Sequence, residues 1–510
     1  MTDHALRLLR QDRRPAALAA FPFDFDVERA AHGHVEPVRL ASGAGPLEVV
    51  AGDDTGGTYF VCPDGSMLYA SSEGVAGIIG STADEALEIL IGLPAWRSCT
   101  DLSPQDGEER ILARVAEAED EMREYYGIDE ERAELRAALG FPERSPVELV
   151  GLLHAALLRT EPDFVLLNGE EFRAYDRLDD LPRPPLWEPV LERGRADLAL
   201  LRAGDQAAVE AVAADPVRRR VVLRAAQFDR AEGDLGWLRR LLPAEAASSM
   251  TDELRLAAVL VGLHGDAADL PLLHEVRETD FDTHCGLSDV PGPGADGAGL
   301  RRWALEMDEA LFGTDPADES MFTWTSLALD QGLTEPARVA LIRRLDAIEV
   351  DQSLLRRPDD PTQLDTTPLE LVAEECERLG DLEQALRARR LHASLQETSR
   401  DRAYSWLDQA GLERRTGRLT EAVRSLASVL GALDGAANDS LRHWRQVNLG
   451  LFVAREHYEL SGALAAAGLL DEALAVLATA DGIRAGLGEA AARGVRELAE
   501  TTAASVRAVS

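Results

Sequence analysis

The chain contains no lysine, and all of its 53 basic residues are arginine. Without a lysine side chain, no Schiff base can form on a protein amine and no P-loop lysine is present to bind a nucleotide phosphate. Aromatic residues are also scarce, at 5% of the chain. Leucine, alanine and valine must therefore fill the core, and such a composition favours close-packed helices over sheet sandwiches.

Cysteine and long apolar runs are scarce as well. The four cysteines, Cys62, Cys99, Cys285 and Cys376, are scattered without a CxxC pair or another metal-ligand spacing, a pattern typical of reduced thiols in a cytoplasmic protein. No uncharged apolar run reaches the ~18 residues needed to span a bilayer. The first residues lack the apolar segment of a secretory signal. We therefore expect a cytoplasmic protein without metal, cofactor or membrane partner.

Acidic residues dominate the charge. With 91 acidic residues the net charge is −38, so the surface repels phosphate and disfavours nucleic acids and anionic membranes. The same field attracts a basic protein surface. The sequence therefore predicts another protein, of basic character, as the partner.

A chain of 510 residues is too long for one compact core. The fold class that we expect is an α+β N-terminal module followed by a mostly α, helical-repeat (α-solenoid-like) C-terminal region. The predicted parts are a small α+β module over 1–100, a helical extension over 101–189 with a β-hairpin near 164–175, HEAT-like helical pairs over 190–350 and tetratricopeptide-like repeats over 351–510.

The sheet module is indicated by short β-prone runs between tight turns. The predicted strands are Pro37–Leu40, Leu47–Val50, Thr58–Cys62 and Met67–Ala70, with a Pro63-Asp64-Gly65 turn before the last. Ser81 or Thr82 then caps a helix over Asp84–Ile91, with acidic residues in its first turn.

This segment resembles the SUKH superfamily. The resemblance covers about 35–95 and rests on AGDDTGGTYF (Ala51–Phe60), on SMLYASSEG (Ser66–Gly74) and on the Glu- and Leu-rich helix that follows. The N-terminal helix that is usual in the family is hardly recognisable here. The resemblance implies a protein-binding fold, often that of an immunity protein that blocks a toxin, with no catalysis of its own.

The helical repeats are indicated by recurring glycine turns. Gly233-Asp234 and Gly265-Asp266 lie between predicted helices, and the second unit resembles a HEAT repeat. Gly380, Gly417 and Gly468 each end a helix and are followed five residues later by an alanine, which resembles the tetratricopeptide repeat. Asn168-Gly169, between two extended runs, predicts the hairpin.

Candidate partner-binding residues follow from these features. On the sheet module we expect an exposed rim in which aromatic anchors are surrounded by acid, and on the repeats we expect an arginine cluster on the concave face. The rim residues are Asp53, Asp54, Tyr59, Tyr69 and Glu73, and the cluster comprises Arg387, Arg389 and Arg390.

Other constellations leave alternatives open. Asp280, Asp282, His284 and Cys285 lie close together and allow a hydrolase site or a metal site, although a polar loop explains them as well. His264 and His274 could approach His284. The pair His32 and His34, and the turn residues Asp53, Asp54 and Asp64, are further weak candidates for cation binding. Gly292–Gly297 satisfies G-x-G-x-x-G, but no strand precedes it and Pro293 removes an amide, so a dinucleotide site is disfavoured.

The sequence therefore predicts a non-enzymatic protein–protein interaction factor, with toxin neutralisation as a specific role. One alternative is a regulatory scaffold whose helical repeats bind a peptide. The other is a hydrolase with its site near Asp280–Cys285.

Overall fold

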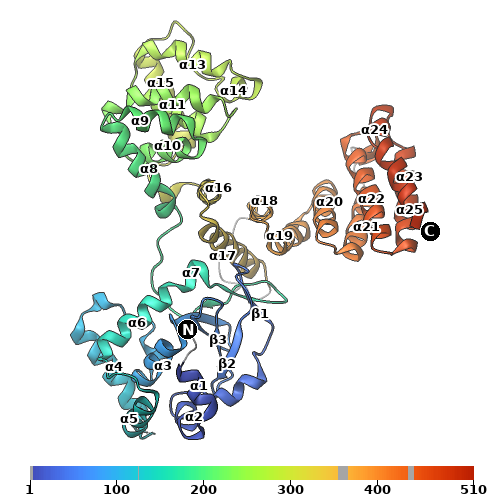
Figure 1. The fold of residues 1–510 in the computed structure, drawn as a ribbon. Helices are drawn as coiled ribbons and strands as arrows, with labels where there is room; N and C mark the ends of the chain where they lie inside the picture. The colour runs from blue at the N-terminus through green and yellow to red at the C-terminus, as the bar shows by residue number, and fades with distance from the viewer. Residues whose placement is uncertain (1–3, 125, 354–365, 435–440, 510) are drawn as a thin grey trace. The chain divides into compact units, whose positions relative to one another are not determined.

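A computed structural model describes residues 4–124, 126–353, 366–434 and 441–509 of the chain (Figure 1). It divides into two compact units, Met1–Ala340 and Leu341–Ser510, and each is described by itself. The expected order, a small N-terminal region with sheets followed by many helices, is confirmed. Within the described ranges, no helix is both long enough and apolar enough to cross a membrane.

The first part of the chain combines helices with two small sheets. Its strands are β1 (Val38–Leu40), β2 (Glu48–Gly52), β3 (Thr58–Val61), β4 (Met67–Ala70), β5 (Val75–Gly80), β6 (Leu166–Asn168) and β7 (Asp176–Arg177). Its helices are α1 (His4–Gln11), α2 (Arg13–Ala20), α3 (Ala83–Gly92), α4 (Glu108–Arg123), α5 (Ile128–Leu139), α6 (Pro146–Leu158) and α7 (Thr160–Asp163), with the 3₁₀ turns η1 (Val27–His32), η2 (Trp96–Cys99) and η3 (Pro104–Asp106).

The larger sheet has the order β2-β3-β4-β5-β7, in which β2 to β5 form an antiparallel meander and β7 runs parallel to β5. Both of its faces are covered. Tyr59, Tyr69 and Ile79 on one face belong to an apolar cluster with residues of α1 and α3. On the other face, Phe60 and Ile78 pack with residues from β1, β6 and α6. The central strands are therefore buried on both sides, where β-branched and aromatic residues pack well.

The boundary that we expected near residue 100 is not present. The cluster on the α1–α3 face extends to Leu181, and β6 and β7 pair with β1 and β5, so 101–185 completes the sheet module. The expected hairpin is only partly formed. The chain reverses between Asn168 and Arg173, whose backbone groups are hydrogen-bonded at 2.9 Å, but the two strands then enter different sheets. The reversal therefore connects the two N-terminal sheets.

The rest of the first unit is helical. Its helices are α8 (Trp187–Arg202), α9 (Gln206–Ala214), α10 (Pro216–Phe228), α11 (Leu235–Ala246), α12 (Asp252–Leu263), α13 (Leu270–Arg277), α14 (Phe281–Gly286), α15 (Gly297–Leu311) and α16 (Met321–Asp330), with the 3₁₀ turns η4 (Glu232–Asp234), η5 (Ala267–Asp269) and η6 (Pro316–Asp318). Helix α17 (Thr334–Gln352) crosses the division between the units. A separate apolar cluster from Val190 to Ala337 holds this part together.

Successive helix pairs are joined by buried arginine–aspartate contacts. Arg202 of α8 donates to Asp234 at 2.9 Å, and Arg239 of α11 donates to Asp269, the equivalent residue before the next helix, at 2.5 Å. Both aspartates are buried. Each of these aspartates ends a 3₁₀ turn directly before a helix, α11 or α13, and is bound by an arginine of an earlier helix.

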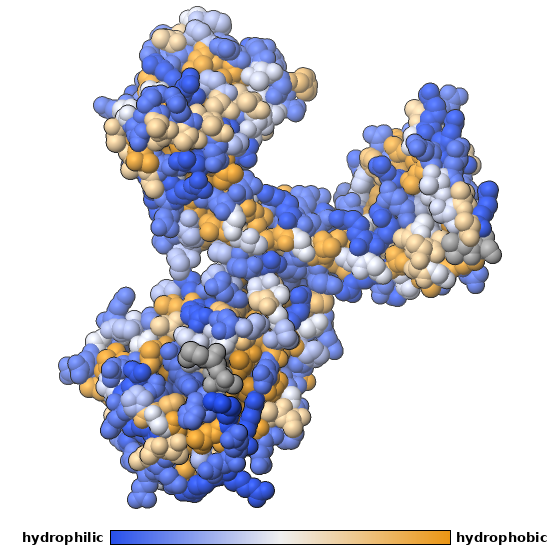
Figure 2. Space-filling view, viewed as in Figure 1, coloured by the Kyte–Doolittle hydropathy of each residue, from blue (hydrophilic) through white to orange (hydrophobic). Residues whose placement is uncertain are grey.

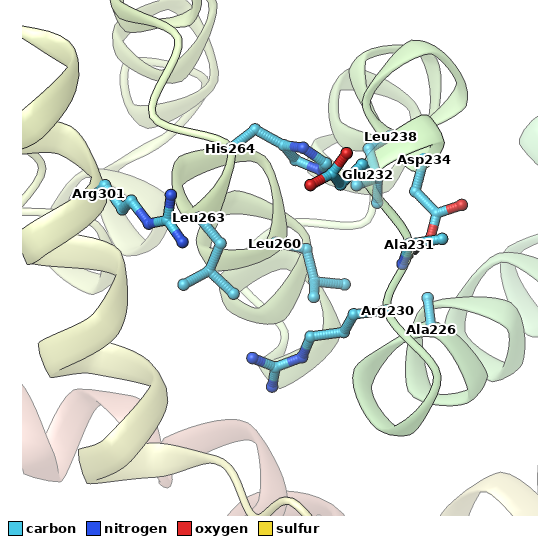
Figure 3. Close-up of a pocket in the computed structure, with 10 residues that line it drawn as sticks. All are labelled: Ala226, Arg230, Ala231, Glu232, Asp234, Leu238, Leu260, Leu263, His264 and Arg301. Carbon is cyan, nitrogen blue, oxygen red and sulfur yellow. Dashed lines mark hydrogen bonds between the residues drawn. The ribbon is translucent and has the colours of Figure 1, made fainter.

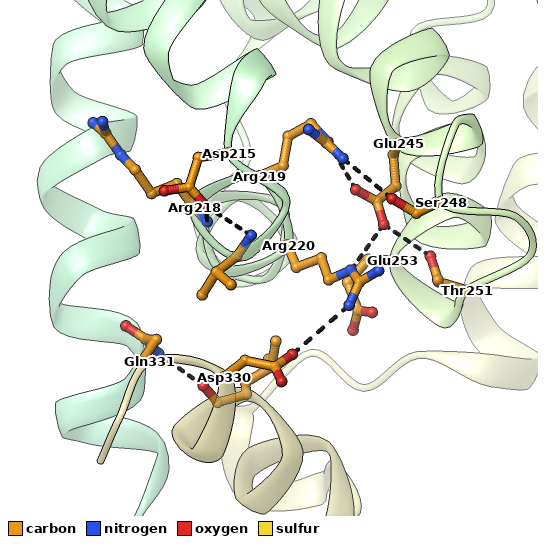
Figure 4. Close-up of polar contacts among 12 residues, drawn as sticks. Asp215, Arg218, Arg219, Arg220, Glu245, Ser248, Thr251, Glu253, Asp330 and Gln331 are labelled. Atoms are coloured by element: carbon orange, nitrogen blue, oxygen red, sulfur yellow. Dashed lines mark hydrogen bonds and ion pairs between the residues drawn. The ribbon is translucent and has the colours of Figure 1, made fainter.

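A second network surrounds Glu245, whose side chain is fully buried (Figure 4). Its carboxylate accepts hydrogen bonds from Arg219 (2.8 Å), Arg220 (2.9 Å) and Thr251 (3.1 Å). Arg220 also lies 3.7 Å from Asp330 of α16. One carboxylate therefore ties α10, α11, the start of α12 and α16 together, with both of its oxygens satisfied.

The second unit contains three helix pairs in the ranges that the structure describes. Its helices are α18 (Leu369–Arg378), α19 (Leu382–Leu395), α20 (Ser399–Arg415), α21 (Leu419–Asp434), α22 (Asn448–Ala466), α23 (Leu470–Ala485), α24 (Glu489–Gly494) and α25 (Arg496–Val509), with the 3₁₀ turn η8 (Trp444–Gln446). Helices α18 and α19, α20 and α21, and α22 and α23 pack as antiparallel neighbours.

The glycine turns end the first helix of each pair, as predicted. Gly380, Gly417 and Gly468 have φ of +73°, +76° and +79°, and in each pair the next residue donates its backbone N–H to the carbonyl five residues earlier. This left-handed cap favours glycine because it has no Cβ. The alanines five residues on, Ala385, Ala422 and Ala473, are fully buried where the helices meet.

Hydrophilic residues cover most of the surface visible in Figure 2, and hydrophobic residues appear there in small groups. The distribution agrees with the acid-rich composition, which leaves few large apolar patches.

Candidate functional site

A groove in the second unit runs along the first helices of its pairs. The groove has a volume of about 480 Å³ and is lined by residues of α18, α20 and α22, with one residue of α19. On α20, Tyr404, Asp408, Gly411 and Arg415 follow one another at spacings of three and four residues, so they share one face of the helix. The lining is completed by Glu377, Arg389, Leu407, Arg414, Phe452, Arg455 and Glu456.

Most of the charges in this groove are paired with one another. Arg414 of α20 donates to Glu456 of α22 at 2.7 Å, and Arg389 lies 3.4 Å from Glu377 and 3.7 Å from Asp408. These contacts join neighbouring pairs across the groove. The walls are therefore held in place by ion pairs rather than left free to collapse.

Phe452 and Asp408 are among the exposed residues of the groove. Phe452 exposes 44% of its surface, although it is a large apolar side chain. Burial, together with the charges of Glu370, Glu377 and Glu374, raises the pKa of Asp408, and Arg389 only partly opposes this effect. The surroundings of Asp408 thus disfavour its charged form, and this carboxyl lies beside an exposed aromatic ring.

The arginine cluster that we predicted on the concave face is mostly used inside the fold. Arg387 is buried and forms ion pairs with Asp346 and Glu349 of α17, and Arg390 donates to the buried Glu413 at 3.2 Å. Only Arg389 lines the groove. Of the three predicted arginines, one therefore lines the groove, and the other two are paired elsewhere in the unit.

The prediction that five residues form an exposed rim on the sheet module is wrong for three of them. Tyr59, Tyr69 and Asp53 are buried, because α1–α3 cover the sheet face from which they extend. The two tyrosines are cross-strand partners with ring centroids 5.0 Å apart. Asp54 and Glu73 are exposed, as expected, but no exposed aromatic anchor accompanies them at this rim.

The buried Asp53 side chain stabilises the fold through hydrogen bonds. Its carboxylate accepts hydrogen bonds from Thr55, from the Gly57 amide at 2.7 Å, from Tyr69 at 2.8 Å and from Arg97 at 2.6 Å. Burial alone would raise the pKa of Asp53, but these donors outweigh it and the pKa is lowered. Asp53 therefore fixes the turn between β2 and β3 and holds η2, which carries Arg97, against the sheet.

The candidate hydrolase segment does not assemble a nucleophile and base. Helix α14 contains the residues expected in a loop, and there Asp280 caps the helix by accepting from the Thr283 amide at 2.8 Å. The His284 Nδ1 lies 3.2 Å from Glu278. Cys285 is exposed, and within the described part of the chain it has no hydrogen bond to His284.

The remaining candidate residues for metal or nucleotide binding form separate contacts within the fold. His274 contacts the Pro291 carbonyl at 2.9 Å, and His34 contacts Thr58 and Tyr175 at 2.9 and 3.0 Å. Among the residues that the structure describes, no three His, Cys, Asp or Glu side chains cluster so that they could hold a metal ion. In the glycine-rich segment, Asp296 caps α15 in the ordinary way.

A second pocket, of about 420 Å³, lies in the first unit at the ends of α10 and α12 (Figure 3). Of its lining residues, His264 and Asp234 were named from the sequence, whereas Arg230, Glu232 and Arg301 were missed. Sequence reasoning also missed the residues that line the α20 face of the groove, although their helical spacing was a usable signal.

No protein-family model, curated protein or solved structure matches this chain. The resemblance to the SUKH superfamily and to the two repeat families therefore stays a prediction from the residues.

Proposed function

We propose that the chain is a non-enzymatic protein-interaction factor that holds an extended segment of another protein in the groove of its second unit. The observation that carries the proposal is that the first helices of three successive helix pairs line one groove with an exposed aromatic side chain inside it. Stacked helix pairs commonly bind partners on such a concave surface, and we propose that these pairs act as a short α-solenoid.

The groove favours a particular partner chemistry. Asp408 lies near Glu370, Glu374 and Glu377, so this part of the groove suits a lysine or arginine of the partner. Besides Arg389, the arginines that line the groove are paired with glutamates: Arg414 with Glu456, Arg415 with Glu377 and Arg455 with Glu459. Phe452, with Tyr404 and Leu407, offers an apolar contact for a neighbouring side chain. A basic residue close to an apolar residue is therefore the segment that we expect, in line with the basic partner predicted from the net charge.

The role of the N-terminal module rests on the SUKH resemblance. It supports toxin neutralisation as the specific role, with Asp54 and Glu73 as the exposed acidic positions of the module. The groove alone equally supports a regulatory scaffold. The proposed setting is the cytoplasm, which the four free thiols support.

The proposal is tested by selecting random twelve-residue peptides displayed on phage against the full chain. We expect enrichment of peptides in which a basic residue neighbours an apolar one. Hydrogen exchange of the full chain with a synthetic copy of an enriched peptide should then show protection in α18, α20 and α22. A selection without enrichment, or protection confined to other helices, would contradict the proposal.

A further inference from the structure

The pocket at the ends of α10 and α12 has a neutral balance of charge around an apolar floor. Ala226, Leu238, Leu260 and Leu263 form the floor, and two arginines, two carboxylates and His264 surround it. Figure 3 shows the side chains of Leu260 and Leu263 between Arg301 on one side and Glu232 with His264 on the other.

Two of the four charged residues, Arg230 and Asp234, are hydrogen-bonded to other residues of the fold. Arg230 donates to both oxygens of Asp308 at 2.7 and 2.8 Å and to the Gln227 carbonyl at 2.9 Å. Asp234 accepts from Arg202 at 2.9 Å and from the indole of Trp237 at 3.2 Å, and it caps its own 3₁₀ turn. Asp234 therefore has no hydrogen-bonding capacity left for charge on a ligand, and Arg230 is held against Asp308 with three of its five N–H groups engaged.

The other polar groups are free. Within the described part of the chain, the side chains of Arg301, Glu232 and His264 take part in no hydrogen bond or ion pair. Acidic residues outnumber arginines by 91 to 53, yet among the residues that the structure describes no carboxylate forms an ion pair with the Arg301 guanidinium. The Arg301 guanidinium and the Glu232 carboxylate thus border the same apolar floor without forming an ion pair with each other. Each can therefore bind a charge of opposite sign.

We propose that this pocket binds a small zwitterion with an apolar body, of the size and chemistry of an aliphatic α-amino acid. The carboxylate of the ligand forms an ion pair with Arg301, and its ammonium group forms one with Glu232. The side chain of the ligand packs on Leu260 and Leu263. An anion without an ammonium group would be repelled by Glu232, and an amine without a carboxylate would be repelled by Arg301. The pocket is large enough for such a ligand and keeps only a small number of polar contacts, as ligand sites commonly do.

The test uses the full chain and three ligands with one carbon skeleton: leucine, 4-methylpentanoate, which lacks the ammonium group, and 3-methylbutylamine, which lacks the carboxylate. Ligand-observed NMR titrations should show that leucine binds with a Kd of about 1 mM or tighter and that each analogue binds at least about ten-fold more weakly. Arg301→Gln should lower the affinity for leucine about ten-fold while leaving that for 3-methylbutylamine unchanged or higher.

Arg302→Gln is the matched control. Arg302 is the exposed neighbour on α15, does not line the pocket and should leave leucine binding unchanged. The proposal is overturned if leucine does not bind at about 10 mM, if Arg301→Gln has no effect, or if 4-methylpentanoate binds as tightly as leucine. Because every variant is changed at an exposed residue, loss of folding does not explain a loss of binding.

Discussion

Replacing Glu245 with alanine should destabilise the helical part of the first unit more than any surface substitution there. The Arg219 side chain is only 4% exposed, and its Nε donates to the Glu245 carboxylate at 2.8 Å. Without that carboxylate, Arg219 remains as a buried charge, and Arg220 loses its closest acceptor as well. Breaking a buried ion pair by removing one partner costs about 3–5 kcal/mol, because the remaining charge is uncompensated.

The local free energy of unfolding is measured by native-state hydrogen exchange at low urea in the full chain, because a chain with several folded parts does not unfold as two states. A loss of about 3 kcal/mol lowers the protection of the slowest amides in α10, α11 and α12 about 150-fold. Glu245→Gln keeps the shape and part of the hydrogen bonding, so its effect should be intermediate.

Asp229→Ala is the control variant, because Asp229 pairs with Arg202 at 2.7 Å but its side chain is 71% exposed. Such an exposed pair contributes about 1 kcal/mol or less. If Glu245→Ala and Asp229→Ala reduced protection equally, burial would not determine the strength of these contacts and the reasoning would be refuted.

Three further predictions concern pH, thiols and glycine turns. Burial lowers the pKa of His457 below its ordinary value of 6.5, so its stabilising contribution is complete above that pH and is lost as the pH falls. His457→Gln should therefore flatten the decline of urea stability toward pH ~5. At pH 8, the Cys285 thiol should react rapidly with a disulfide reagent, because it is exposed and the other three cysteines are buried. Burial also raises the pKa of Cys62 to about 12 and that of Cys99 to about 11, which disfavours their reactive thiolates. Rapid modification of all four thiols would contradict the structure. Gly417→Ala, at a φ of +76°, should destabilise the second unit by about 1 kcal/mol, whereas Gly482→Ala, inside α23 with open space around it, should stabilise it slightly in thermal unfolding.

Local signals in the sequence were sufficient for most elements. Four of the strands, β1 to β4, lie where alternating β-prone runs between turns placed them, and the three glycine caps of the second unit end their helices as predicted. These features depend on neighbouring residues alone. Strand β5 (VAGIIG) was missed because its two glycines lower its strand propensity, and it is stabilised by its partners β4 and β7.

Contacts between distant segments could not be predicted. Tyr59 and Tyr69 carry hydroxyl groups and looked suitable for a half-exposed strand, but α1–α3 cover that face, and only the folded chain brings them there. Arg387 looked like a surface charge until α17 supplied Asp346 and Glu349 as partners. In each case a residue far along the chain determines whether a side chain is available to a ligand.

The central claim, that the groove of the second unit binds the partner, is tested most directly by comparing two exposed apolar residues. Phe452 lies in the groove and Leu474 lies on α23 outside it, and each exposes 44% of its surface. The Kd of a peptide selected on the full chain should rise about ten-fold or more for Phe452→Ser and should stay unchanged for Leu474→Ser. Equal affinities for the two variants, or a loss only for Leu474→Ser, would contradict the account.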